Sequence, residues 1–134
     1  MLGDFQAYGV IAVRDMQRAK DFYGSILGLE PFPIPLSEDV STAVFVAGDG
    51  SLVSLYREFE DETPMPATTV LGFNVRNLNG VLDGLRSRGV QQYTSNLPVA
   101  ADENGIVSFG PVRCAWINDS EGNIIILTEL PSQA

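Results

Sequence analysis

The feature that most constrains this chain is an internal repeat. Residues 8–15 read YGVIAVRD, and residues 70–77 read VLGFNVRN. Each copy is a short apolar strand that ends in Val-Arg. A residue suited to cap a helix follows, Asp15 in the first copy and Asn77 in the second. A chain that repeats a strand and a cap in this way is expected to fold as two copies of one small unit.

The residues after each copy continue the repeat. Apolar side chains recur at helical spacing from Met16 to Leu27 and from Leu78 to Leu85, and a glycine at 28 and at 89 is placed to end each helix. Three strand candidates follow each helix. They lie at about 29–34, 42–47 and 51–57 in the first copy and at about 90–94, 111–117 and 123–129 in the second. This order of elements predicts an α+β fold made of two βαβββ modules.

Turn residues and polar stretches mark the module boundaries. AGDGS at 47–51 and DSEGN at 119–123 are the predicted turns before the last strand of each module. The stretch 96–111 is a predicted loop, in which Asn104-Gly105 favours a tight turn. We expect a single domain over 1–134, with the first module at about 5–58, an acidic linker at about 59–68 and the second module at about 69–130.

Composition excludes several classes of function. The chain has 8 Lys and Arg against 17 Asp and Glu, a net charge of −9, which disfavours nucleic acid because phosphates need a basic surface. No apolar run reaches the roughly 18 residues of a membrane span, and we expect neither membrane insertion nor a signal peptide. Cys114 is the single cysteine, which favours a cytoplasmic location. Histidine, the commonest general base and a common metal ligand, is absent.

Four stretches of the chain carry a resemblance to a known family. They are YGVIAVRDMQRAKDFYGSILGLE at 8–30, LVSLY at 52–56, VLGFNVRNLNGVLDGLRSRG at 70–89 and WINDSEGNIIILTE at 116–129. The sequence resembles the vicinal oxygen chelate superfamily, which includes glyoxalase I, extradiol dioxygenases, fosfomycin-resistance enzymes and bleomycin-binding proteins. The resemblance implies a U-shaped half-barrel of mixed sheet, built by the two modules around one cavity, and assembly as a homodimer.

The resemblance also identifies four positions at which metal-binding members of the family carry their ligands. In this chain those positions hold Tyr8, Ser54, Val70 and Ile126. Val and Ile offer no donor atom, and neutral Ser and Tyr are poor ligands for a divalent metal. We therefore expect no metal and no other cofactor. The glyoxalase, fosfomycin-transferase and dioxygenase reactions of the family depend on that metal, so these activities are not expected here.

Strand alternation predicts which side chains share a face with the four positions. They are Tyr8, Val10, Ala12, Leu52, Ser54, Tyr56, Val70, Gly72, Asn74, Ile124, Ile126 and Thr128. The strand at 112–117 adds either Cys114 and Trp116 or Arg113 and Ala115. The predicted ligand-binding residues are Tyr8, Ser54, Tyr56, Val70, Asn74, Arg113, Trp116 and Ile126.

Three interpretations of function remain open at this point. The preferred one is a metal-free protein of the bleomycin-resistance type that sequesters a small aromatic or cationic organic molecule in the cavity. The second is a metal-independent lyase or isomerase that uses Tyr8, Tyr56 or a loop carboxylate such as Asp102 or Glu103, although no catalytic residue is assigned. The third is an accessory subunit whose cavity is filled by core side chains such as Ile126.

Overall fold

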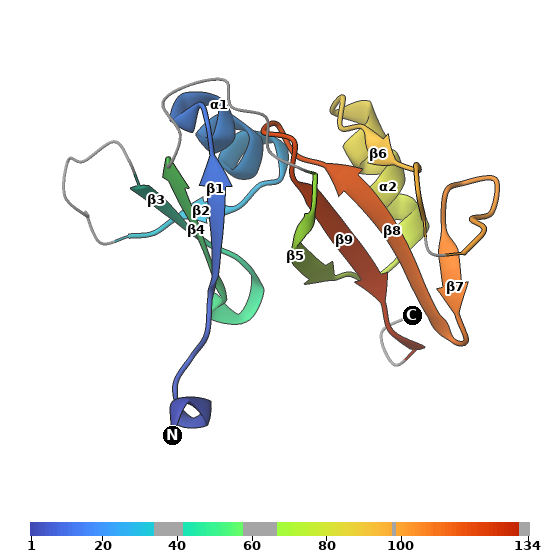
Figure 1. Ribbon diagram of the computed structural model, residues 1–134, viewed down its shortest axis with the longest axis horizontal. Helices are drawn as coiled ribbons and strands as arrows, with labels where there is room; N and C mark the ends of the chain where they lie inside the picture. The colour runs from blue at the N-terminus through green and yellow to red at the C-terminus, as the bar shows by residue number, and fades with distance from the viewer. Residues whose placement is uncertain (34–41, 58–66, 98, 132–134) are drawn as a thin grey trace. The chain divides into compact units, whose positions relative to one another are not determined.

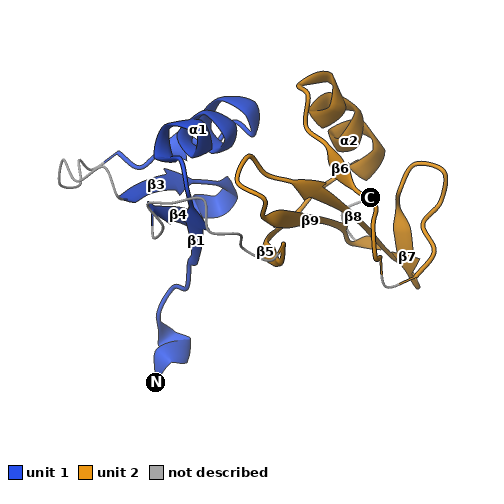
Figure 2. Ribbon diagram, turned by 45° about the horizontal axis from the view of Figure 1, so that its top comes forward, with its two compact units in different colours: residues 1–64 blue, residues 65–134 orange. Residues whose placement is uncertain are grey.

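The computed structural model describes residues 1–33, 42–57, 67–97 and 99–131 (Figure 1). The chain divides into two compact units, residues 1–64 and 65–134 (Figure 2). Each unit contains one copy of the repeat. The boundary falls in the predicted linker, and most of that linker lies outside the described residues.

The first unit is a four-stranded mixed sheet with one helical segment. Its strands are β1 (Gly9–Val13), β2 (Glu30–Pro31), β3 (Thr42–Val46) and β4 (Leu52–Arg57), and a short helix η1 (Leu2–Asp4) precedes them. The order across the sheet is β1-β4-β3-β2. β1 runs parallel to β4, whereas β3 runs antiparallel to both of its neighbours. The predicted order of elements in the first module is confirmed.

The helical segment of the first unit begins and ends where the sequence predicts. α1 (Met16–Lys20) continues directly into a π-helical stretch, η2 (Asp21–Ile26), which the apolar spacing did not predict. The Asp15 carboxylate caps α1 by accepting a hydrogen bond from the backbone N–H of Arg18 at 3.0 Å. Gly28 has a φ of 82°, a conformation that favours glycine, and it stops the helix.

The second unit repeats this architecture and adds one strand. Its strands are β5 (Thr69–Asn74), β6 (Gln92–Tyr93), β7 (Val107–Phe109), β8 (Val112–Asn118) and β9 (Ile124–Glu129), and its helix is α2 (Leu78–Ser87). The order is β5-β9-β8-β6, with β7 also paired to β8. β5 is parallel to β9, as β1 is to β4. The extra strand β7 lies in the stretch that was predicted to be a loop.

Two equivalent turns support the duplication. In the first unit the backbone N–H of Ala47 donates to the carbonyl of Ser51 at 2.8 Å, and in the second the N–H of Asp119 donates to the carbonyl of Asn123 at 2.9 Å. The second turn is further held by the Asp119 carboxylate, which accepts from the backbone N–H of Glu121 at 2.7 Å and of Asn123 at 2.8 Å. These bonds fix the start of β9.

The core of each unit lies between its sheet and its helix. In the first unit Ile11, Val13 and Leu55 are at most 1% exposed, and an added Cβ at Gly24 would lie 3.1 Å from the Phe45 ring. In the second unit Ile125 is fully buried in β9. The fold is therefore α+β, as predicted, with two open mixed sheets and few helices. No helix of the described residues is long and apolar enough to cross a membrane.

Candidate functional site

The sheet of the first unit has one face toward α1 and one open face. Residues paired across neighbouring strands point to the same side of a sheet. Val10 pairs with Ser54 and Ala12 with Tyr56, so these four side chains share the face opposite Ile11 and Leu55. That open face is the one predicted for the ligand. Val10 is 56% exposed, which is high for a strand valine.

The open face of the first unit is largely apolar. Besides the four residues above it carries Leu52, Val44 and Val46, which β3–β4 pairing places on the same side. Ser54 supplies a hydroxyl and is only 7% exposed, whereas Tyr56 is half-buried. Tyr8 precedes β1 and is 59% exposed. The chemistry of this face suits flat or aliphatic surface with one or two polar groups.

The equivalent face of the second unit is covered by its own side chains. Trp116 pairs with Ile126 and with Tyr93, and Cys114 pairs with Thr128, so these residues share one face. Trp116 is 8% exposed. A buried cluster of Val107, Cys114, Trp116 and Ile124 forms there, with Tyr93, Leu97, Val112 and Ile126 packed against it. Trp116 is therefore part of a hydrophobic cluster within its unit.

Ile126, at one of the four family ligand positions, leans across the neighbouring strand. It pairs with Gly72, and an added Cβ at Gly72 would lie 3.0 Å from the Cγ2 methyl of Ile126. Only a residue without a side chain leaves this space for the isoleucine. The isoleucine methyl thus lies directly over β5 on this face.

The remaining predicted residues of the second unit lie at different places. Val70 lies at an irregularity in the β5–β9 pairing between Thr69 and Leu71, and it is 37% exposed. Such a bulge locally redirects side chains. Asn74 pairs with Thr128 on the face of Ile126 and is exposed.

Arg113 lies on the opposite face, so the structure does not group it with Trp116 and Ile126. It pairs with Glu129 in the sheet, and its guanidinium donates to the Glu129 carboxylate at 3.0 Å and to the side-chain oxygen of Asn79 at 2.7 Å. Asn79 belongs to α2, which places Arg113 on the helix side of the sheet. Of the two predicted options for this strand, Cys114 and Trp116 share the face of the family ligand positions.

Glu129 is a residue that sequence reasoning did not single out. Its carboxylate also accepts a hydrogen bond of 2.7 Å from the backbone N–H of Leu78, the first residue of α2. This bond, together with the hydrogen bond and charge of Arg113, lowers the pKa of Glu129 below its ordinary value against the opposing effect of burial. In the sequence, Glu129 is visible only as a carboxylate that ends an apolar strand. Leu78, from whose backbone N–H it accepts a hydrogen bond, lies 51 residues away and could not be identified from the sequence.

The described residues offer no cluster of metal-binding side chains. No group of three or more His, Cys, Asp or Glu residues lies close enough to hold an ion in the part of the chain that the structure describes. On the face of Ile126 in the second unit, the Cys114 sulfur lies 3.8 Å from the Thr128 hydroxyl. The donor set at the four family positions thus does not suit a divalent metal.

The match to a family model decides the ancestry of the chain. Residues 6–125 match the model of the Glyoxalase/Bleomycin resistance protein/Dioxygenase superfamily. The chain belongs to this superfamily. The match spans both repeats, so the predicted family is confirmed. No curated protein sequence matches this member of the superfamily.

Several solved structures share its fold. A glyoxalase/dioxygenase from Nostoc punctiforme is 21% identical, with a TM-score of 0.68 over 98% of this chain and 95% of that one. A glyoxalase/bleomycin resistance protein from Catenulispora acidiphila is 28% identical, with a TM-score of 0.60 over 95% and 99%. TnmS3, an antibiotic binding protein from Streptomyces, is 20% identical, with a TM-score of 0.63 over 94% and 97%.

Proposed function

We propose that this superfamily member is a small-molecule-binding protein that works without a metal. The observation that carries the proposal is the open face of the first unit, where Val10, Ala12, Ser54 and Tyr56 present apolar surface with two hydroxyl groups. A soluble domain gains little by leaving such a face uncovered. Occupation by an organic ligand explains why it stays apolar.

The proposed ligand face lies on the first unit. The second unit covers its own face with the cluster around Trp116, so the proposed contacts come chiefly from Tyr8, Ser54 and Tyr56 of the first unit. Arg113, which is bonded to Glu129 and Asn79 on the helix side, is left out of the proposed site.

The proposed ligand is a small aromatic or cationic organic molecule, held for sequestration. Tyr8 and Tyr56 can stack on a flat ring, each pair adding about 0.5–1.5 kcal/mol beyond the burial of area. The net charge of −9 favours a cationic ligand over an anionic one. That TnmS3 is named an antibiotic binding protein supports this class of ligand.

Thermal melts with a panel of flat aromatic and aromatic cationic compounds test the proposal. At least one compound should raise the melting temperature of the wild-type protein, because a ligand that binds only the folded state stabilises it. Val10→Lys should remove that shift, since it places a bulky cation on the open face. Lysine is tolerated on an edge strand such as β1, so the variant should still fold.

The matched control is Val99→Lys, a similarly exposed valine at 47% that lies in the second unit outside both sheets. It should leave the shift unchanged. A panel that never moves the wild-type melt, or a shift that survives Val10→Lys, would rule the proposal out.

A second candidate is an accessory protein whose faces are filled by its own side chains. The cluster of Val107, Cys114, Trp116 and Ile124 favours it, because it closes one of the two faces. Because Ile126 packs against this cluster, Ile126→Ala should destabilise the fold by roughly 2–5 kcal/mol. The compound panel separates the two candidates, since an accessory protein with filled faces should show no ligand-induced rise of the wild-type melting temperature.

A further inference from the structure

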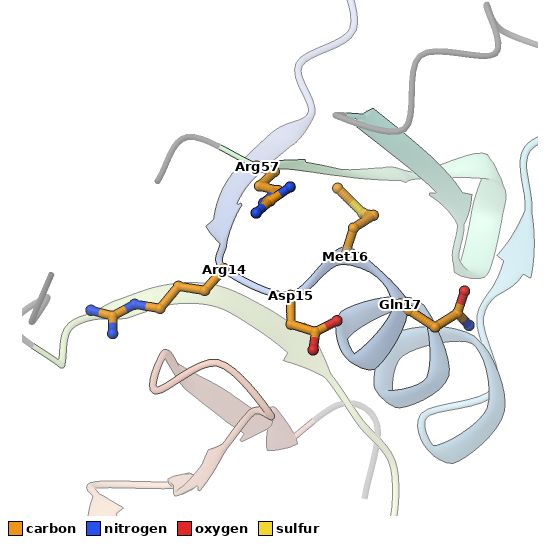
Figure 3. Close-up of a pocket in the computed structure, with 5 residues that line it drawn as sticks. All are labelled: Arg14, Asp15, Met16, Gln17 and Arg57. Atoms are coloured by element: carbon orange, nitrogen blue, oxygen red, sulfur yellow. The ribbon is translucent and has the colours of Figure 1, made fainter. Parts of the chain in front are cut away.

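A pocket in the first unit lies away from the proposed ligand face. It has a volume of about 340 Å³ and lies at the carboxyl ends of the parallel strands β1 and β4 (Figure 3). The residues that line it are Arg14, Asp15, Met16, Gln17 and Arg57. Ligands of sheets with parallel strands commonly bind beyond the carboxyl ends of those strands.

The internal repeat shows what occupies the equivalent place in the second unit. Arg57 is the residue paired with Val13 at the end of β4. In the second unit Asn74 pairs with Thr128, and the N–H of Val75 donates to the Thr128 carbonyl, so the next residue of β9, Glu129, stands where Arg57 stands in the first unit. The two modules therefore carry opposite charges at one structural position.

In the second unit an ion pair within the unit neutralises the charge of Glu129. No such ion pair is described for Arg57 in the first unit. Glu129 forms an ion pair of 3.0 Å with Arg113. No ion pair among the described residues includes Arg57. Asp15 lines the same pocket, but its carboxylate is committed to the N–H of Arg18 and is turned away from Arg57 in Figure 3. The side chain of Arg14 extends away from the other four residues.

We propose that this pocket binds a small anion bearing a carboxylate or phosphate group, which pairs with the guanidinium of Arg57. The anion would supply from outside the negative charge that Glu129 supplies in the second unit. A guanidinium presents a planar fork of N–H donors that fits either group with two parallel hydrogen bonds. Gln17 also lines the pocket, but its side-chain amide donates to the Asp21 carboxylate at 3.0 Å, so the guanidinium of Arg57 is the group that the anion would pair with. The site is independent of the proposed ligand face, and its failure leaves that proposal untouched.

Titration of the ¹⁵N-labelled full chain with acetate, and separately with inorganic phosphate, tests the inference by NMR at constant ionic strength. Saturable shifts should appear at the amides of Met16 and Gln17 and at the side chain of Arg57. The acetate and phosphate arms show which of the two groups is preferred. Arg57→Gln should weaken binding about tenfold or more, since a hydrogen bond to a charged group is lost.

The matched control is Arg76→Gln, which makes the same change of charge at an exposed residue of the second unit. It should leave the affinity unchanged. Arg57→Glu should abolish binding, because it places a carboxylate at the position that Glu129 has in the second unit. Shifts that do not saturate, or that Arg57→Gln and Arg76→Gln weaken equally, would overturn the inference. The inference would also be overturned if the wild type bound neither anion and ligand-free Arg57→Gln melted at a lower temperature. Arg57 would then stabilise the folded chain and would not be a ligand-binding residue.

Discussion

Gly72→Ala tests the contact made by Ile126, one of the two family ligand positions of the second unit. The new methyl would begin 3.0 Å from the Cγ2 atom of Ile126, whereas carbon atoms attract best at about 3.5–4.0 Å. One strand or the isoleucine must therefore move by about 0.5–1 Å. Overpacking of this kind costs about 1–3 kcal/mol. Replacing a strand glycine returns about 0.5–1 kcal/mol through the lower entropy of the unfolded chain. We expect a net destabilisation of about 1 kcal/mol.

Urea unfolding of four proteins measures this contact: the wild type, Gly72→Ala, Ile126→Ala and the double variant. Without the Cγ2 methyl of Ile126, the alanine at 72 meets no clash, so Gly72→Ala should then be neutral or stabilising. The coupling free energy of the cycle should be about 1–2 kcal/mol. Gly84→Ala in α2 serves as the control, because nothing lies within 4 Å of its added Cβ. It should stabilise the protein by about 0.5–1 kcal/mol. An equal cost of Gly72→Ala in both backgrounds would refute the placement of Ile126 over β5.

Three further outcomes are expected. Because the pKa of Glu129 is lowered in the folded state, its carboxylate stabilises the fold fully above the ordinary glutamate pKa of about 4.3, and this contribution is lost as the pH falls through the folded value. The urea midpoint of Glu129→Gln should therefore fall below that of the wild type at pH 7, and the two midpoints should converge as the pH falls below the folded pKa of Glu129; a gap that does not narrow in acid would contradict this. Protein purified without chelator should hold well under one equivalent of zinc, nickel, manganese or iron by elemental analysis, and a stoichiometric ion would refute the metal-free site. The predicted homodimer should appear in sedimentation at micromolar concentration, where a lone 14.5 kDa species would count against it.

Local features of the fold could be predicted from sequence because each depends on a few neighbouring residues. The caps Asp15 and Asn77 each accept the expected hydrogen bond, from the N–H of Arg18 and of Gly80. Helical spacing and alternating apolar residues located both helices and nearly every strand. The exceptions are short or irregular. β7 covers only three residues, and the π-helical stretch after α1 leaves the apolar periodicity almost unchanged.

The site was harder to predict because it depends on register between distant strands. Cys114 and Trp116 or Arg113 and Ala115 were equally acceptable choices for the face of β8 until its pairing with β9 was known. The pairing of Trp116 with Ile126 decides the choice. The bulge at Val70 could not be predicted for the same reason, because a break in register between two strands leaves no mark in the sequence of either strand.

The second module covers one face of its sheet with a long connection. The second module joins β6 to β8 through residues 94–111, and this stretch supplies Leu97 and Val107 to the cluster over Trp116. The first module joins β2 to β3 through the shorter stretch 32–41. A longer connection can fold back over its own sheet, and the face it covers becomes core. The proposed ligand face therefore lies on the other module, where Val10 remains 56% exposed. On this proposal, one copy of the duplicated unit has become structural and the other offers the apolar surface for a ligand.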